Sequence, residues 1–223
     1  DKDLYKKICL NSFDVIITIF LFMTFNLVLT KKLNLNLPNK VFLGNWCLNN
    51  NFKINNEKII HAKTVIISTG ASAKYLGLES EQRLIGGGVS ACAVCDGFFY
   101  KNQEVAIVGG GDTAAEEATY LSNICSKVTM LVRKDHMRAS KAMQHRVNSR
   151  ENIELKYNSE VKEVLGENVV EGLKIINNKT NEIEEISITG FFVAIGHKPN
   201  TDIFKGQLEM DETGYILTEG KST

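Results

Sequence analysis

Residues 104–132 read EVAIVGGGDTAAEEATYLSNICSKVTMLV, and this stretch decides the predicted fold. Glu104–Val108 is an apolar run of strand length, and three glycines follow it. Apolar residues then recur at every third or fourth position from Ala115 to Ile124, which indicates one face of a helix. Lys127–Val132 is a second apolar strand. Strand, glycine turn, helix and strand in this order predict an α/β, Rossmann-like dinucleotide-binding domain.

The glycine turn has the form Gly109-x-Gly111-x-x-Ala114 and stands between a strand and a helix, the context that a dinucleotide fingerprint requires. Gly109 allows the tight turn, Gly111 lets the backbone approach a pyrophosphate, and Ala114 permits close packing of helix on strand. The free N–H groups at the helix start favour phosphate. The predicted nucleotide-binding residues here are Gly109, Gly110, Gly111, Asp112, Thr113 and Ala114.

The end of the second strand distinguishes the two nicotinamide cofactors. An NAD site places Asp or Glu there, to accept a hydrogen bond from the ribose 2′-hydroxyl. This chain places Arg133 and Lys134 there instead, with Arg138 close behind. The three cations favour the 2′-phosphate of NADPH. The alternative is a basic loop that only contacts solvent, and Asp135 in the same loop weakens the case for phosphate slightly.

Cys92 and Cys95 have the spacing of a redox dithiol, for which a zinc site and a pair of inert structural thiols are the alternatives. Zinc needs two further ligands, and the four histidines offer no closely spaced pair. Asp96 follows directly and could pass protons to a leaving thiolate, or it could simply cap a helix. Hydride from NADPH reaches a disulfide through a flavin, so the combination implies FAD.

Further elements are predicted on both sides of this unit. A buried strand over Thr64–Ser68 ends at Thr69 and Gly70, and another over Phe191–Ile195 ends at Gly196. Between them, Val169–Ile176 and Glu184–Ile188 form an inserted β-hairpin around NNKTNE. Thr69, Gly70 and Gly196 are the remaining candidate cofactor-binding residues.

Composition excludes some classes of function. The 223 residues are 43% apolar and 23% charged, and Lys+Arg and Asp+Glu are equal at 26, so no net field attracts nucleic acid or an anionic membrane. The five cysteines are too sparse for a secreted disulfide scaffold, which favours the cytoplasm. The apolar run 8–29 has the length of a membrane span, but Asn11, Asp14 and Asn26 within it favour a buried segment.

SACAVCDGFFYKNQEVAIVGGGDTAAEEATYLSNI, RKDHMRA and GFFVAIGHKPNT together resemble the low-molecular-weight, bacterial-type thioredoxin reductases, from about Glu57 to about Leu217. The resemblance implies an FAD domain interrupted by an NADPH domain, a homodimer, and thioredoxin as the disulfide substrate. It implies that Cys95 faces the flavin, that Cys92 attacks thioredoxin and that Asp96 is the general acid.

The chain also departs from that family. Its basic cluster reads Val-Arg-Lys where the family has His-Arg-Arg, so a point charge replaces a planar, bidentate donor at Lys134. We expect residues 1–73 to be a divergent FAD-domain remnant, 74–201 the NADPH domain, and 202–223 the returning FAD segment. The family's FAD-binding glycine motif and its closing segment are not found, so the chain is expected to be incomplete. A nucleotide-binding module without catalysis and a reductase that serves a peroxiredoxin are the alternative functions.

Overall fold

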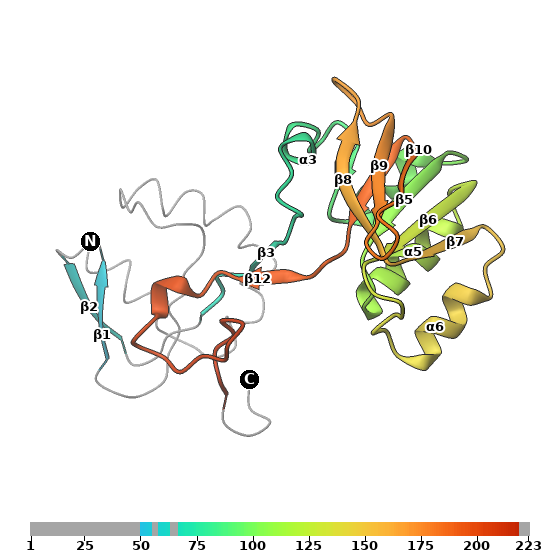
Figure 1. Cartoon of the computed structure of the whole chain (residues 1–223). Helices are drawn as coiled ribbons and strands as arrows, with labels where there is room; N and C mark the ends of the chain where they lie inside the picture. Colours follow the sequence, from blue (N-terminus) through green and yellow to red (C-terminus); the bar gives the residue numbers. More distant parts are fainter. Residues whose placement is uncertain (1–49, 55–57, 63–66, 219–223) are drawn as a thin grey trace. The chain divides into compact units, whose positions relative to one another are not determined.

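The computed structural model describes residues 50–54, 58–62 and 67–218 (Figure 1). These residues divide into two compact units. The larger unit consists of Ala71–Lys198 and Met210–Tyr215, and it contains the glycine turn and the cysteine pair. The other unit takes the described residues up to Gly70 together with Pro199–Glu209 and the chain from Ile216.

A five-stranded parallel sheet forms the centre of the larger unit. Val105 and Ile107 of one strand are buried on one face of the sheet, and Ala106 and Val108 are buried on the other. A strand buried on both faces reads as a continuous apolar run, which explains the AIV pattern of the sequence. In spatial order the strands are β4 (Val89–Ser90), β11 (Gly190–Val193), β5 (Glu104–Val108), β6 (Lys127–Val132) and β7 (Ile153–Tyr157).

Two helices cover one face of this sheet (Figure 1). Helix α5 (Asp112–Ser122) buries Ala115, Ala118 and Leu121 completely, as its apolar spacing predicts. Helix α6 (Lys141–Asn148) is preceded by Ser140, whose hydroxyl accepts a hydrogen bond from the N–H of Met143. Such a cap satisfies one of the free N–H groups at the start of the helix. Three short helices complete the unit, α3 (Glu79–Arg83), α4 (Ala93–Asp96) and the 3₁₀ turn η1 (Gly97–Tyr100).

A three-stranded antiparallel sheet covers the other face. Its apolar side chains, among them Val161, Val164 and Leu173, join Phe191 and Leu131 of the parallel sheet in one buried cluster. The larger unit is therefore a three-layer sandwich of helices, parallel sheet and antiparallel sheet. The strands of the antiparallel sheet are β8 (Ser159–Leu165), β9 (Gly172–Asn177) and β10 (Ile183–Ser187), in the order β10-β9-β8.

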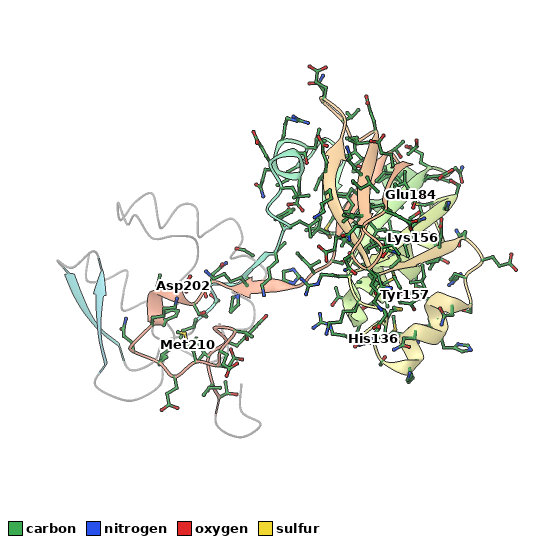
Figure 2. All side chains as sticks on the ribbon, viewed as in Figure 1. His136, Lys156, Tyr157, Glu184, Asp202 and Met210 are labelled. Carbon is green, nitrogen blue, oxygen red and sulfur yellow. A yellow bond between two sulfur atoms is a disulfide. The ribbon has the colours of Figure 1, made fainter. Side chains whose placement is uncertain are left out.

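Lys156 ties the two sheets together at their margins (Figure 2). Its ammonium group, on β7, lies 3.0 Å from both carboxylate oxygens of Glu184 on β10 and 3.3 Å from Glu154. The side chain of Lys156 is only 21% exposed, so these bonds are less screened than those of an ordinary surface pair.

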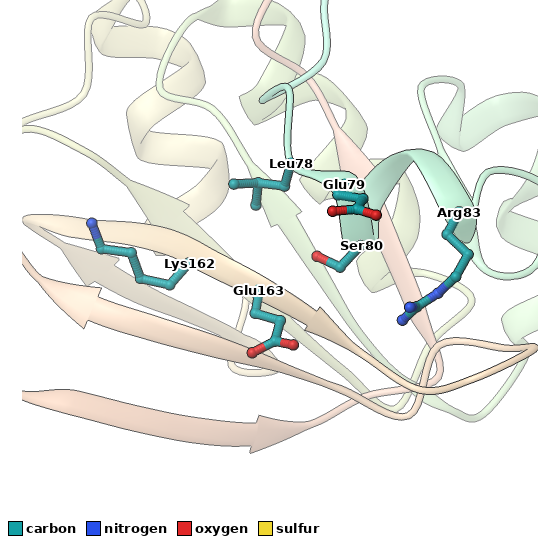
Figure 3. A pocket seen from close by; sticks show the side chains of 6 residues that line it. All are labelled: Leu78, Glu79, Ser80, Arg83, Lys162 and Glu163. Atoms are coloured by element: carbon teal, nitrogen blue, oxygen red, sulfur yellow. The ribbon is translucent and has the colours of Figure 1, made fainter.

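Helix α3 rests on β8 beside a shallow hollow lined by Leu78, Glu79, Ser80, Arg83, Lys162 and Glu163 (Figure 3). The Ser80 hydroxyl accepts a hydrogen bond from the N–H of Val164 at 3.0 Å. The guanidinium of Arg83 donates to the carbonyl of Gly166 at 2.9 Å. These bonds fix the helix on the strand, and the hollow contains none of the predicted site residues.

The smaller unit contains the paired strands β1 (Asn50–Ile54) and β2 (Lys58–Ala62) and the 3₁₀ turn η2 (Asp202–Phe204). Strand β3 (Ala71–Ala73), just after Gly70, pairs with β12 (His197–Pro199), just after Gly196 (Figure 1). The two segments that lead into and out of the larger unit therefore run side by side.

The predicted strands over Glu104–Val108 and Lys127–Val132 are confirmed without a change of boundary. The hairpin is confirmed in kind, but β9 begins three residues later than predicted. Val170 instead donates its N–H to the carbonyl of Gly87 at 2.8 Å, which keeps that stretch out of the ladder. The strand predicted from Phe191 ends at Val193, two residues early.

Other predictions are corrected or lie outside the described residues. The inserted element is a three-stranded sheet, since β8 pairs with β9, and the hairpin is only part of it. Ile67 and Ser68 are not in a strand, and the rest of the predicted strand over Thr64–Ser68 lies outside the described residues, as does the apolar run 8–29. Within the part of the chain that the structure describes, no helix has the length and apolar character to cross a bilayer.

Candidate functional site

The predicted redox and nucleotide residues of the larger unit gather at one edge of its parallel sheet. All five strands run in the same direction, so their carboxyl ends share that edge. Strand β4 leads there to Cys92, β5 to Gly109 and β6 to Arg133, and β11 leads to Gly196. In open parallel sheets this edge is where ligands bind.

The glycine turn has a backbone that other residues could not adopt easily. Gly109 has φ +152°, and a Cβ there would collide with the carbonyl of Ala194 and lie 2.7 Å from the Cβ of Ala114. Gly111 is different, because a Cβ built there meets nothing within 4 Å. Internal packing therefore requires Gly109, whereas Gly111 borders open space at the start of α5, where a phosphate would approach.

The basic loop is held over the glycine turn by backbone hydrogen bonds. The carbonyl of Gly110 accepts from the N–H groups of Arg138 at 2.7 Å and Ala139 at 3.0 Å. The carboxylate of Asp112 accepts from the N–H of Ser140 at 2.9 Å. Hydrogen bonds from the backbone and the side chain of Ser140 lower the pKa of Asp112 below its ordinary value. The structure thus brings Arg138 to the start of α5, as a phosphate site requires.

The three predicted cations are exposed, and none of them has a carboxylate partner among the residues that the structure describes. Asp135, which counted against a phosphate site, is paired with Lys179 at 3.2 Å and with His136 at 2.7 Å. Hydrogen bonds from His136 and then Lys179 lower the pKa of Asp135. The only carboxylate of the loop is therefore engaged elsewhere, and the positive charge of Arg133, Lys134 and Arg138 is left for a ligand.

Cys92 and Cys95 form a disulfide, with 5.3 Å between their Cα atoms. Cys92 precedes α4 and is half-buried, whereas Cys95 lies in its single turn and is exposed. The hydroxyl of Ser90, at the end of β4, accepts from the N–H of Cys92 at 3.1 Å. Ala93 between the cysteines is fully buried against α5. The disulfide is therefore fixed to the sheet on one side and to a helix on the other.

Asp96 ends the short helix, is half-buried, and donates its N–H to the carbonyl of Cys92 at 3.1 Å. Burial raises the pKa of the Tyr100 hydroxyl, and the negative charge of Asp96 raises it further. Next to the disulfide, Val94, Phe98 and Phe99 have 67–73% of their surfaces exposed. Exposed apolar groups of this size beside a reactive centre are typical of a protein-binding surface.

Thr69 and Gly70 belong to the smaller unit. Thr69 is buried, and its carbonyl accepts from the side-chain amide of Asn200 at 3.1 Å. Gly70 has φ +68°, and its carbonyl accepts from the N–H of Asn200 at 3.0 Å. Gly196 has φ +101° and receives a hydrogen bond from the N–H of Lys74. The two glycines therefore allow tight turns with left-handed backbone, where β3 and β12 begin.

The family model for pyridine nucleotide-disulphide oxidoreductases matches residues 29–222. The chain belongs to this family. The thioredoxin reductase of Streptomyces coelicolor is 51% identical over 162 residues, which is 73% of this chain and 50% of that protein. That of Rickettsia conorii is 49% identical over 165 residues, or 73% of this chain and 53% of that protein. The chain spans about half the length of these curated relatives.

Solved structures give the same family. The thioredoxin reductase of Giardia duodenalis superposes with a TM-score of 0.67 at 42% identity, over 76% of this chain and 55% of that one. That of Lactococcus lactis gives 0.68 at 34% identity, over 76% and 56%. The predicted resemblance and the Rossmann-like α/β class are therefore confirmed, and the family match begins upstream of Glu57, where the resemblance was expected to start.

Sequence reasoning missed several residues that shape this candidate site. Lys179 and Asn178 come from the turn between β9 and β10, and Asn178 bonds the carbonyl of Arg133 at 2.8 Å. No sequence signal relates that turn to a strand end 45 residues away. Phe98 and Phe99 gave no sign in the sequence that they would be exposed, since aromatic residues are more often buried.

Proposed function

We propose that this chain carries the nucleotide-binding and disulfide parts of a thioredoxin reductase. In the proposed reaction, two electrons pass from NADPH by way of FAD to the Cys92–Cys95 disulfide, and the resulting dithiol reduces the disulfide of thioredoxin. The observation that carries the proposal is that the disulfide and the glycine turn leave the same edge of one parallel sheet. The thioredoxin reductases among its relatives support the choice of substrate.

The residues present fit NADPH. The start of α5 and the open space at Gly111 suit a pyrophosphate, and the unpaired cations suit a 2′-phosphate. Residues 74–201 would form the NADPH domain, flanked by FAD-domain parts over 1–73 and 202–223. The proposed NADPH contacts are Gly109, Gly110, Gly111, Asp112, Thr113, Ala114, Arg133, Lys134 and Arg138. Thr69 and Gly70 are proposed to face FAD, and Gly196 is a further proposed cofactor-binding residue.

FAD, when bound, accepts hydride and delivers electrons to sulfur one pair at a time. The chain's own residues hold the disulfide at the sheet edge and supply protons. Reduction breaks the sulfur–sulfur bond and consumes two electrons and two protons, and Asp96 is proposed to donate a proton to the leaving thiolate. Cys95 is proposed to face the flavin and Cys92 to attack thioredoxin. We further propose a homodimer in the cytoplasm.

A trapping experiment tests the substrate and the two cysteine roles together. The 223-residue chain with Cys95→Ser, mixed with oxidised thioredoxin, should accumulate a disulfide-linked adduct through Cys92, because the resolving thiol is gone. Cys92→Ser is the matched control and should give no stable adduct. Mass spectrometry of the products measures both.

Each result has a clear reading. An adduct only with Cys92→Ser would exchange the two roles. The absence of an adduct with both variants would contradict the reductase function and favour a nucleotide-binding module.

A further inference from the structure

Glu117 lies on α5, and none of the roles above uses it. The short helix α4 packs directly on α5, with Ala93 completely buried beside Ala114 and Ala118. A Cβ at Gly97, the residue that follows α4, would lie 3.0 Å from a methyl group of Leu121, so the chain stays close to α5 where α4 ends. Glu117 lies on the same helix, and its carboxyl group accepts a hydrogen bond from the N–H of Ala93.

The carboxyl group of Glu117 meets the backbone next to Cys92. Burial raises the pKa of Glu117 above its ordinary value, the N–H of Ala93 opposes that shift, and the charge of Glu116 adds to it. Ala93 directly follows Cys92, so a single peptide bond separates the N–H that faces the carboxyl group from the reactive cysteine. A charge on Glu117 is therefore close to that cysteine.

One oxygen of this carboxyl group is unpartnered. Oε2 of Glu117 is buried and has no hydrogen-bond partner among the described residues. No lysine or arginine in that part of the chain forms an ion pair with Glu117. A poorly solvated carboxylate without a counter-charge interacts with nearby charges more strongly than a surface carboxylate does.

The other titratable groups come from the elements packed against α5. Cys92 precedes α4, which carries Cys95 and Asp96, the following turn carries Tyr100, and Glu116 precedes Glu117 on α5. Helix α6 also packs on α5 and carries Lys141, His145 and Arg146, but none of these forms an ion pair with Glu117 in the described part of the chain.

We propose that Glu117 is a positioning residue of the Cys92–Cys95 redox centre, which opposes thiolate formation while it is ionised and ceases to do so when it is protonated. The proposal rests on the proposed function only in taking this disulfide as the redox centre. A dithiol reductant breaks the sulfur–sulfur bond, supplies two electrons and two protons, and is itself oxidised to a disulfide. The new thiol then loses a proton, and the carboxylate beside Ala93 makes that loss less favourable.

The experiment measures thiolate formation directly. The full 223-residue chain is reduced with dithiothreitol, freed of it, and alkylated with iodoacetamide at a series of pH values. Mass spectrometry quantifies the peptide that contains Cys92 and Cys95, so the other cysteines do not interfere. Because only the thiolate reacts, Glu117→Gln should shift the midpoint of the pH–rate profile to lower pH and raise the rate at pH 7.5 by about threefold to tenfold.

Glu116→Gln is the matched control, since it removes the same charge from the neighbouring exposed position and should leave the profile nearly unchanged. Equal profiles for Glu117→Gln and the unaltered chain would overturn the proposal, as would an equal shift in Glu116→Gln.

Circular dichroism and urea unfolding of Glu117→Gln and Glu116→Gln check that both variants are folded, so that a shift confined to the Glu117→Gln profile is not a loss of structure. The reagents include neither nucleotide nor thioredoxin, so this outcome is independent of the trapping experiment.

Discussion

At the scale of single residues, the two outer glycines of the turn have different reasons to be glycine. Gly109 is surrounded by its own protein, since both the carbonyl of Ala194 and the methyl group of Ala114 occupy the place of a Cβ. Gly111 is limited by nothing in the chain itself. Sequence alone assigned different tasks to the two positions, and the structure supplies the contacts that make the difference testable.

Gly109→Ala should therefore lower the free energy of unfolding, by about 2–4 kcal/mol, because the added methyl group meets backbone that cannot move away. Gly111→Ala should change stability by less than about 0.5 kcal/mol but weaken NADPH binding by about tenfold. Urea unfolding followed by circular dichroism and titration calorimetry provide the two measurements. A Gly111→Ala protein that binds NADPH normally would remove this residue from the phosphate site.

At the scale of elements, the loop after β6 depends on backbone bonds that no side-chain pattern records. Gly110 holds Arg138 and Ala139 through its carbonyl oxygen, and any residue can donate such an N–H. The sequence therefore predicted which cations belong to the cluster, from their place at a strand end, but not how the loop folds back. The pairing of Asp135 with Lys179 could not be predicted either, because no pattern in the sequence shows which distant segment lies beside the loop.

We expect the chain to bind NADPH more tightly than NADH, and Arg133→Glu to abolish the difference. A charge-assisted phosphate contact contributes about 1.5–3 kcal/mol, so the substitution should weaken NADPH binding by about tenfold to a hundredfold and leave NADH almost unaffected. Titration calorimetry with both nucleotides measures this. Arg150→Glu, which changes an exposed arginine beyond the end of α6, is the control. Equal affinities in the unaltered chain would contradict the assignment of the cluster.

Helix α3 contains a buried acid with a structural task. Glu81 is fully buried, and its two carboxylate oxygens accept from the N–H groups of Leu76 and Gly77, each at 2.9 Å. Glu81→Ala leaves both donors without an acceptor and should lower the free energy of unfolding by about 2–4 kcal/mol. Glu79→Ala, at an exposed position two residues earlier, should change it by less than about 0.5 kcal/mol. Urea unfolding of the two variants tests the comparison, and similar values would refute it.

The strands of the larger unit show where sequence reasoning succeeds. Glu104–Val108 and Lys127–Val132 are buried on both faces, and such strands appear as uninterrupted apolar runs. Strands β7 and β8 alternate apolar with charged residues, because Lys156, Glu160 and Lys162 point away from the core, and their short patterns were not recognised. The turn residues predicted the hairpin correctly. The side-chain oxygen of Asn177 accepts from the N–H groups of Lys179 and Thr180 at the predicted turn.

At the scale of the whole molecule, alkylation of the buried Cys125 can report unfolding of the core. Cys125 follows α5 within the helix-side core, and burial raises the pKa of its thiol to about 11. At pH 8 the thiolate fraction in the folded state is then on the order of 10⁻³, which protects Cys125 from alkylation in addition to its burial. The folded chain should leave Cys125 unmodified by iodoacetamide at pH 8, and urea should expose it.

Peptide mapping by mass spectrometry measures this labelling. Cys95, exposed once the disulfide is reduced, is the internal positive control. Because unfolding should be cooperative, the labelling of Cys125 should follow the loss of helical signal in urea. Labelling of the folded protein as fast as that of Cys95 would show that the core opens locally.

The pairing of β3 with β12 has a consequence for protein engineering. The N–H of Lys74 donates to the carbonyl of Gly196 at 2.9 Å. The two ends of the intervening 121-residue segment are therefore only one backbone hydrogen bond apart. If this segment were inserted into a surface turn of another protein, the two residues that flank the insertion could stay close together. The loop-closure entropy lost on insertion would then be small. The same closeness would let a short glycine linker join the two ends and new termini be opened elsewhere. The segment is thus suited both to transplantation and to circular permutation.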